Sequence, residues 1–176
     1  EPRFIDAYFN RATVKMELGD NKGAIADYSV VIENDSLQQN DVAFYKRGKA
    51  KYALNDKNGA SEDYGNALKI NPKNADYYYY RGLIRFEDGK YKEAVFDFNK
   101  AIIVDTKHAY AYNDRGSAKR LMEDYKGAMQ DYEKAIIFLE EALEIDTKLG
   151  VQYGVASELG KIGVVYNKTG KHDKAL

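Results

Sequence analysis

Several residue types that carry chemistry are missing or scarce in this chain of 176 residues. Cysteine is absent, which excludes disulfide bonds, thiol nucleophiles and cysteine-ligated metal sites. Histidine occurs only twice, and neither His108 nor His172 stands at metal-binding spacing from other ligand-type residues. No combination of nucleophile, base and orienting residue stands out, because the many carboxylates follow helix-surface periodicity. We therefore expect no catalysis, no metal and no cofactor.

The chain also lacks an excess of charge of either sign, with 27 Lys and Arg against 28 Asp and Glu. Without a net positive field, nothing steers it toward nucleic acid or an anionic membrane surface. No apolar run approaches the roughly 18 residues that span a bilayer, and no signal-like start is visible. The sequence thus predicts no nucleic-acid partner and no membrane partner, and a cytoplasmic location is favoured.

What the chain does contain is an internal repeat, which is clearest between residues 74 and 106. A small residue is followed twelve positions later by an alanine, then by an aromatic residue and a second alanine: Gly82, Ala94, Phe98 and Ala101. The pattern recurs at a shift of 34 residues on both sides, at Gly48, Ala60, Tyr64 and Ala67 and at Gly116, Ala128, Tyr132 and Ala135. A fixed period of this length predicts stacked supersecondary units, each in contact only with its neighbours.

The repeating unit resembles the tetratricopeptide repeat, a helix-turn-helix in which a large residue, a small residue, Ala, an aromatic residue and Pro recur. The resemblance implies an all-α fold, a right-handed α-solenoid of antiparallel helix-turn-helix repeats. Helices are expected near residues 5–18, 22–34, 41–54, 57–70, 75–88 and 91–104. Gly19 and Asp20 indicate a helix stop followed by an N-cap.

Five repeats fit the chain, at residues 5–38, 41–74, 75–108, 109–149 and 150–176, after residues 1–4 as the end of a preceding repeat. Pro2 stands where the family's Pro would fall in that earlier repeat, and the fifth repeat stops within its second helix. We therefore expect a piece of a longer array. Its incomplete last repeat is expected to fray or to associate end to end with another molecule.

The period breaks in the fourth repeat, where ALEIDT follows seven residues later than its counterpart AIIVDT in the third. Seven residues are nearly two helical turns, so the apolar face stays in line and the second helix is expected to continue. The lengthened stretch also resembles a longer tetratricopeptide variant that is common in bacterial regulatory proteins.

One departure from the family pattern occurs in four repeats. An arginine precedes the small residue and an aspartate follows it fifteen positions later. We expect a structural ladder of bidentate ion pairs between helices, made by Arg11, Asp27, Arg47, Asp63, Arg81, Asp97, Arg115 and Asp131. A second set of cations, Lys15, Lys51, Arg85 and Lys119, is expected to cover apolar helix surface with its stems; a phosphate-tracking stripe is the alternative.

In an array of this type the first helices line a concave groove, and residues spaced three and four apart share that face. The expected groove residues are largely aromatic in three repeats and mostly polar in the fourth: Phe9, Thr13, Met16, Tyr45, Lys49, Tyr52, Tyr79, Leu83, Phe86, Tyr110, Asn113, Ser117 and Arg120. Aromatic anchors favour a peptide or protein partner. The alternative is that some of these rings only pack against adjacent helices.

The sequence therefore predicts a non-catalytic interaction scaffold that holds a peptide or a partner helix in the groove. The main alternative is a regulatory or sensor segment of a larger bacterial signalling protein, coupled to an output domain elsewhere. Some tetratricopeptide proteins grip a chaperone tail with an ordered set of Lys, Asn, Asn, Lys and Arg. The matching positions read Phe9, Thr13, Lys46, Asp76 and Tyr80, so that clamp is not expected. An RNA-binding helical repeat would need a basic groove and is disfavoured.

Overall fold

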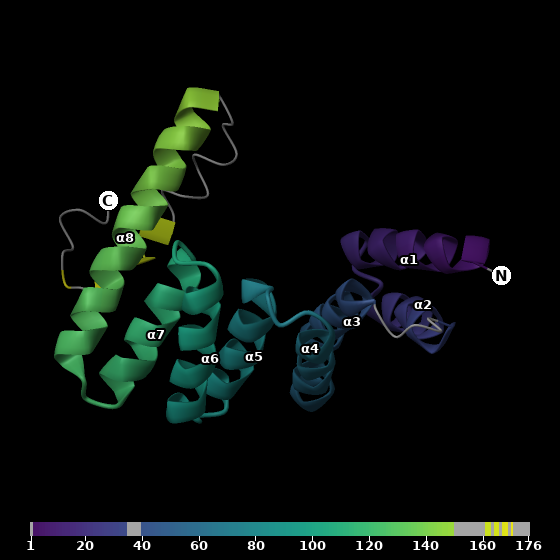
Figure 1. Ribbon diagram of the computed structural model, residues 1–176, viewed down its shortest axis with the longest axis horizontal. Coiled ribbons are helices and arrows are strands. Elements are labelled where there is room, and N and C mark those ends of the chain that lie inside the picture. The colour runs from purple at the N-terminus through teal and green to yellow at the C-terminus, as the bar shows by residue number, and fades with distance from the viewer. Residues whose placement is uncertain are drawn as a thin grey trace. The chain divides into compact units, whose positions relative to one another are not determined.

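The computed structural model describes residues 2–34, 40–149, 161–162, 164–165, 167–168 and 170, and within these residues it contains helices and no strand (Figure 1). The continuous helices are α1 (Pro2–Glu17), α2 (Asn21–Asn34), α3 (Asp41–Ala53), α4 (Lys57–Ile70), α5 (Ala75–Glu87), α6 (Tyr91–Val104), α7 (Ala109–Leu121) and α8 (Tyr125–Leu149). Of the expected fifth repeat, residues 150–160 and 171–176 lie outside the described residues, as does the connection 35–39. The predicted all-helical fold class is confirmed.

The helix bounds follow the repeat pattern closely. Helices α4 and α6 have the predicted bounds, and the predicted ends of α2, α3 and α5 differ from the observed ones by at most one residue. Helix α1 begins at Pro2, three residues before the predicted start at Ile5. Proline suits the first turn of a helix, where its missing N–H is not needed. Helix α8 runs on to Leu149 and has 25 residues, whereas α6 has 14.

The chain divides into two compact units, Glu1–Ile84 and Arg85–Leu176. In the first unit α1 packs on α2, α2 on α3 and α3 on α4. In the second unit α6 packs on α7, and α7 on α8. A second helix thus contacts both its own partner and the first helix that follows it in the chain.

The tight turn inside each repeat has the same backbone geometry. One residue of the turn adopts a positive φ in all four repeats: Gly19 (80°), Asn55 (63°), Gly89 (75°) and Glu123 (64°). Three of the turns continue into an aspartate N-cap, whose Oδ1 accepts a hydrogen bond of 2.9 Å from the backbone N–H three residues on: Asp20, Asp56 and Asp124. The predicted stop and cap at Gly19 and Asp20 are confirmed.

The small residues mark where the paired helices come closest. A Cβ added at Gly48 would lie 2.8 Å from Cε1 of Tyr64, and one at Gly116 would lie 2.9 Å from Cε1 of Tyr132. Both tyrosines are buried, so neither ring has free space to move into. Glycine at these positions therefore lets a large ring of the second helix pack directly on the backbone of the first.

Candidate functional site

The expected groove residues of the first unit lie on its three successive first helices, α1, α3 and the part of α5 up to Ile84. All are partly buried: Phe9, Thr13, Met16, Tyr45, Lys49, Tyr52, Tyr79 and Leu83. Partial burial fixes a ring in place while leaving part of its surface open to contact. These side chains therefore form the best candidate for a preformed binding face.

Tyr45 is held mainly by other rings of the first unit. Its ring centroid lies 5.0 Å from that of Tyr77, 5.6 Å from Tyr80 and 6.0 Å from Tyr64. Burial raises the pKa of Tyr45, so the phenol stays neutral. This environment fits the packing alternative for Tyr45 better than the anchor hypothesis.

Phe9 and Tyr79 sit at the margins of this aromatic cluster. Phe9 packs edge-on against the buried Tyr28 at 5.5 Å, and Tyr79 packs edge-on against Tyr80 at 5.1 Å. Both rings remain partly exposed. These two rings are better placed than Tyr45 to contact a partner.

Two lysines of α3 lie on this aromatic surface. Lys46 Nζ is 5.9 Å from the ring centroid of Phe9, and Lys49 Nζ is 5.6 Å from that of Tyr45 and 5.3 Å from that of Tyr80. Within the described part of the chain, neither ammonium group has a carboxylate within 4.0 Å. The pattern of groove residues included Lys49 but missed Lys46, because Lys46 lies one position beside the strict three-and-four spacing.

In the second unit the expected groove residues are more dispersed. Phe86 packs against Tyr91 of α6 at 5.6 Å, while Tyr110 and Arg120 are exposed and Asn113 is partly buried. No continuous aromatic face therefore forms from these residues.

Ser117 corrects the groove prediction, since only 6% of its surface is exposed. Its hydroxyl lies 3.2 Å from the Tyr132 hydroxyl and 3.1 Å from Lys168 Nζ, and it donates to the carbonyl oxygen of Asn113. A later segment of the chain covers this position, so Ser117 has a structural contact instead of a free surface.

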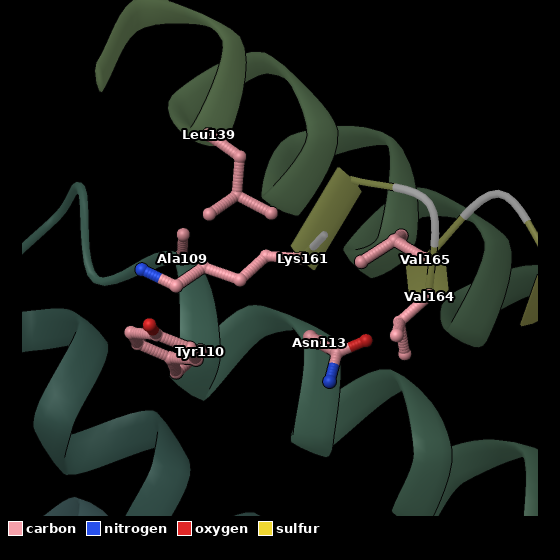
Figure 2. A pocket seen from close by; sticks show the side chains of 7 residues that line it. All are labelled: Ala109, Tyr110, Asn113, Leu139, Lys161, Val164 and Val165. Carbon is pink, nitrogen blue, oxygen red and sulfur yellow. The ribbon is translucent and has the colours of Figure 1, made fainter. Parts of the chain in front are cut away.

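Figure 2 shows a small cleft in the second unit, with side chains from α7, α8 and the segment that follows α8 pointing toward one space. Its volume is about 120 Å³, and it is lined by Ala109, Tyr110, Asn113, Leu139, Lys161, Val164 and Val165. Lys161 Nζ lies 5.0 Å from the centroid of the Tyr110 ring. The cleft has the size and apolar walls for one aliphatic side chain. Tyr110 and Asn113 of this set are among the predicted groove residues.

The arginines and aspartates singled out by the sequence lie together in three repeats. Arg11 donates to Asp27 through Nε at 2.8 Å and Nη2 at 2.7 Å. The corresponding bonds from Arg47 to Asp63 are 2.9 and 2.7 Å, and Arg115 and Asp131 are paired in the same bidentate manner. Arg81 and Asp97 belong to different units, and their pairing stays a prediction.

A cation four positions after the ladder arginine contacts each of the four aspartates. The nitrogen-to-oxygen distances are 2.9 Å for Lys15 with Asp27, and 2.8 Å for Lys51 with Asp63, Arg85 with Asp97 and Lys119 with Asp131. The interpretation of this second set as stems over apolar surface, or as a phosphate stripe, is therefore wrong. The aspartates are buried, and one carboxylate with two cations is a structural device within a repeat.

The ionic contacts shift the titration of the first aspartate. Hydrogen bonding from Arg11, supported by Lys15, lowers the pKa of Asp27 from 3.8 to about 2, against the opposing effect of burial. The carboxylate thus stays charged over the whole range in which proteins are ordinarily handled.

The described residues contain no group of three or more His, Cys, Asp or Glu that could hold a metal ion. Among them, no helix is both long enough and apolar enough to cross a bilayer.

Comparison with known proteins explains the repeated geometry. Family profiles described as "Tetratricopeptide repeat" match residues 6–36, 75–108, 109–136 and 127–149, and one described as "TPR repeat" matches residues 48–89. This chain belongs to the tetratricopeptide repeat family. The four profiles together cover most of the described helices, so the family assignment applies to both units.

Individual relatives share this repeat. A curated relative, DnaJ homolog subfamily C member 3 from Gallus gallus, is 36% identical over 70 residues, which are 40% of this chain and 13% of that protein. The chain thus spans only a small part of that relative's length. The crystal structure of MamA is similar over 93% of this chain and 87% of its own, at 25% identity and a TM-score of 0.69. The second tetratricopeptide domain of Spaghetti (RPAP3), bound to the HSP90 peptide SRMEEVD, covers 61% of this chain and 99% of its own, at 25% identity and a TM-score of 0.56.

Proposed function

We propose that this tetratricopeptide repeat chain is a non-catalytic scaffold that binds an extended peptide on the first-helix face of its first unit. The observation that carries the proposal is the aromatic surface of Phe9, Tyr79 and Tyr80 with Lys46 and Lys49 lying on it. Rigid, partly open rings bind a partner with little loss of side-chain freedom. The peptide complex of the RPAP3 domain supports a peptide as the kind of partner, because that domain shares the repeat.

The two lysines favour a peptide that carries acidic residues. On the same helix, Arg47 and Lys51 form ion pairs with the buried Asp63, whereas Lys46 and Lys49 lie over aromatic rings and pair with no carboxylate of the described residues. A carboxylate of the partner would supply the counter-charge that the described residues do not supply. The ordered chaperone-tail set is not matched at its positions, so we expect a different peptide from the one bound by RPAP3.

The proposal can be tested by selecting peptides from a random 12-residue display library on the whole chain and titrating a labelled synthetic copy. Replacing Lys46→Glu together with Lys49→Glu should weaken binding at least tenfold. The matched control is Lys22→Glu with Lys69→Glu, which makes the same change in net charge at exposed positions of α2 and α4. Equal affinity of the two double variants would contradict the proposed site.

The contribution of the rings calls for a separate variant. Tyr79→Ala should weaken binding of the same peptide severalfold, because the Tyr79 ring is partly exposed on the proposed face. Tyr125→Ala on α8, an exposed tyrosine outside this face, serves as its control. Tyr45 is left intact, since its contacts with three other rings make a loss of stability the main effect of its removal.

The alternative of a regulatory segment depended on the lengthened fourth repeat. Helix α8 has that length, but the contacts of the described residues tie it to the hairpin with α7 and to residues 162 and 165. These contacts support a packing role, and we therefore favour the scaffold. End-to-end association of the chain stays a prediction.

A further inference from the structure

The first unit has a cleft that takes no part in the proposed peptide face. Residues of α2, α3 and α4 enclose it, its volume is about 310 Å³, and it is lined by Ile32, Phe44, Asn66, Lys69 and Ile70. Three of these side chains are apolar. The two polar ones lie together on α4, where Lys69 Nζ donates a hydrogen bond of 2.9 Å to Asn66 Oδ1.

The equivalent place in the second unit is filled by side chains of α8. Counting two repeat periods, or 68 residues, from Phe44, Asn66 and Ile70 gives, in the same order, Tyr112, Lys134 and Phe138. The ring centroids of Tyr112 and Phe138 are 5.5 Å apart, and Lys134 Nζ lies 5.4 Å from the Tyr112 centroid. These contacts cover Tyr112, which is only 5% exposed.

The first unit has shorter side chains at both covering positions, because isoleucine replaces phenylalanine at residue 70 and asparagine replaces lysine at residue 66. Phe44 is accordingly less buried than its counterpart. Arg47 lies 5.5 Å from the Phe44 centroid, and among the described residues no aromatic ring packs on Phe44. The cleft thus corresponds to the place that an aromatic ring takes in the second unit.

The polar rim of the cleft favours an anion. Lys69 is exposed, it forms no ion pair with a carboxylate of the described residues, and no carboxylate is among the lining residues. Its hydrogen bond uses the Oδ1 acceptor of Asn66, which leaves the Nδ2 donor for a ligand. Arg47 adds little to this rim, because its Nε, Nη1 and Nη2 already donate to Asp63 and Ser29.

We propose that this cleft binds a small molecule in which an aromatic ring is joined to a carboxylate. The ring packs on Phe44, between the two isoleucines, and the carboxylate accepts hydrogen bonds from Lys69 and Asn66. A small molecule fits this site better than a protein partner does. Small-molecule pockets begin at about 300 Å³, whereas a stable protein interface involves roughly 20–30 residues on each side.

The experiment titrates the whole chain with two probes and follows binding by ligand-observed NMR. Hydrocinnamate has a phenyl ring and a carboxylate, and hydrocinnamamide keeps the ring but has no charge. Hydrocinnamate should bind saturably at millimolar or lower concentration, and hydrocinnamamide at least tenfold more weakly. Absence of saturable hydrocinnamate binding, or equal affinity for the two probes, would overturn the proposal.

Two variants locate the bound probe. Ile70→Phe gives α4 the ring that α8 has at the equivalent position, so it should abolish hydrocinnamate binding by filling the cleft. Lys69→Glu changes an exposed side chain, leaves the packing intact and should weaken binding at least tenfold. It therefore tests the site even if Ile70→Phe disturbs the fold, which thermal unfolding would detect.

The matched control is Lys22→Glu, which makes the same charge change at an exposed position of α2 that does not line the cleft. This variant should bind hydrocinnamate as the original chain does. Undiminished affinity in Ile70→Phe or Lys69→Glu, or an equal loss in Lys22→Glu and Lys69→Glu, would overturn the proposed site.

Discussion

The second and fourth repeats have the same interior and different exteriors. Inside, each has a glycine against a buried tyrosine and an aspartate bound by an arginine and a lysine: Gly48, Tyr64, Asp63, Arg47 and Lys51 in one, and Gly116, Tyr132, Asp131, Arg115 and Lys119 in the other. At the predicted groove positions the two repeats differ, since Tyr45, Lys49 and Tyr52 of α3 correspond to Asn113, Ser117 and Arg120 of α7. The shared interior therefore accounts for the common hairpin, and under the proposed function the differing positions of the first helix set what it binds.

The largest expected effect is on the shared interior. Asp63→Ala and Asp131→Ala each leave two cations without their carboxylate in a buried place, and each should reduce the free energy of unfolding by about 3–5 kcal/mol. Urea unfolding measures the loss. Asp88→Ala, which removes an exposed ion pair with Lys90, should change the free energy of unfolding by less than about 1 kcal/mol. A similar small change at Asp63 would show that the two repeats do not depend on the shared carboxylate.

The next largest loss of stability is expected from replacing the glycines that contact the buried tyrosines. Gly48→Val and Gly116→Val place side-chain atoms against a buried tyrosine and a backbone carbonyl, and each should destabilise the fold by about 1–3 kcal/mol. The matched control is Gly65→Ala in α4, where an added Cβ meets nothing within 4 Å. Because alanine is favoured over glycine in a helix by about 1 kcal/mol, Gly65→Ala should raise the urea midpoint. Opposite signs at Gly48 and Gly65 are the expected outcome, and equal signs would contradict the close-packing argument.

In the first repeat, the Arg11–Asp27 ion pair is partly exposed, and it is expected to make stability depend on pH. Asp27 has a folded pKa of about 2 against an ordinary value of 3.8, so its stabilising effect is complete above about pH 4 and is lost as the pH falls through about 2. The shift corresponds to about 2 kcal/mol. Urea unfolding of the original chain and of Asp27→Asn, each at neutral pH and near pH 2.5, isolates this contribution. The variant should lose less stability on acidification, and an identical loss would exclude Asp27 as a source of the acid sensitivity.

The smallest effect is expected on the exterior. Lys49→Ser gives α3 the residue that α7 has at this position, and it removes one ammonium group from the rings of Tyr45 and Tyr80. Stability should fall by no more than about 1 kcal/mol, while affinity for an acidic peptide should fall severalfold. Thermal unfolding and peptide titration of the same variant measure the two quantities. A large loss of stability would mean that this outward position also sets the hairpin.

The repeat period made the helices and their internal contacts predictable. Spacing alone located the helix ends to within a residue or so, because a 34-residue unit must pack the same face each time. The recurrence of arginine and aspartate in four repeats likewise identified residues that meet in three of them. The role of Lys15 and its equivalents was missed, because periodicity locates a side chain on a helix but does not say which of several carboxylates it reaches.

What differs between repeats was harder to predict, since it depends on single substitutions in a neighbouring element. Tyr45 joins the core because Tyr77 occupies a place that is alanine in α3 and α7. Ser117 is covered by Lys168, which lies 51 residues further along the chain. Neither contact follows from the pattern within one helix.

Helix α8 has 25 residues where α7 has 13, and its buried residues remain on one side as far as Leu139. Seven inserted residues rotate the helix by about 20° short of two full turns, whereas five would rotate it by roughly 140°. An insertion into such a helix therefore keeps the same face packed only when its length is close to a whole number of helical turns. An insertion of another length would have to be accommodated in a loop.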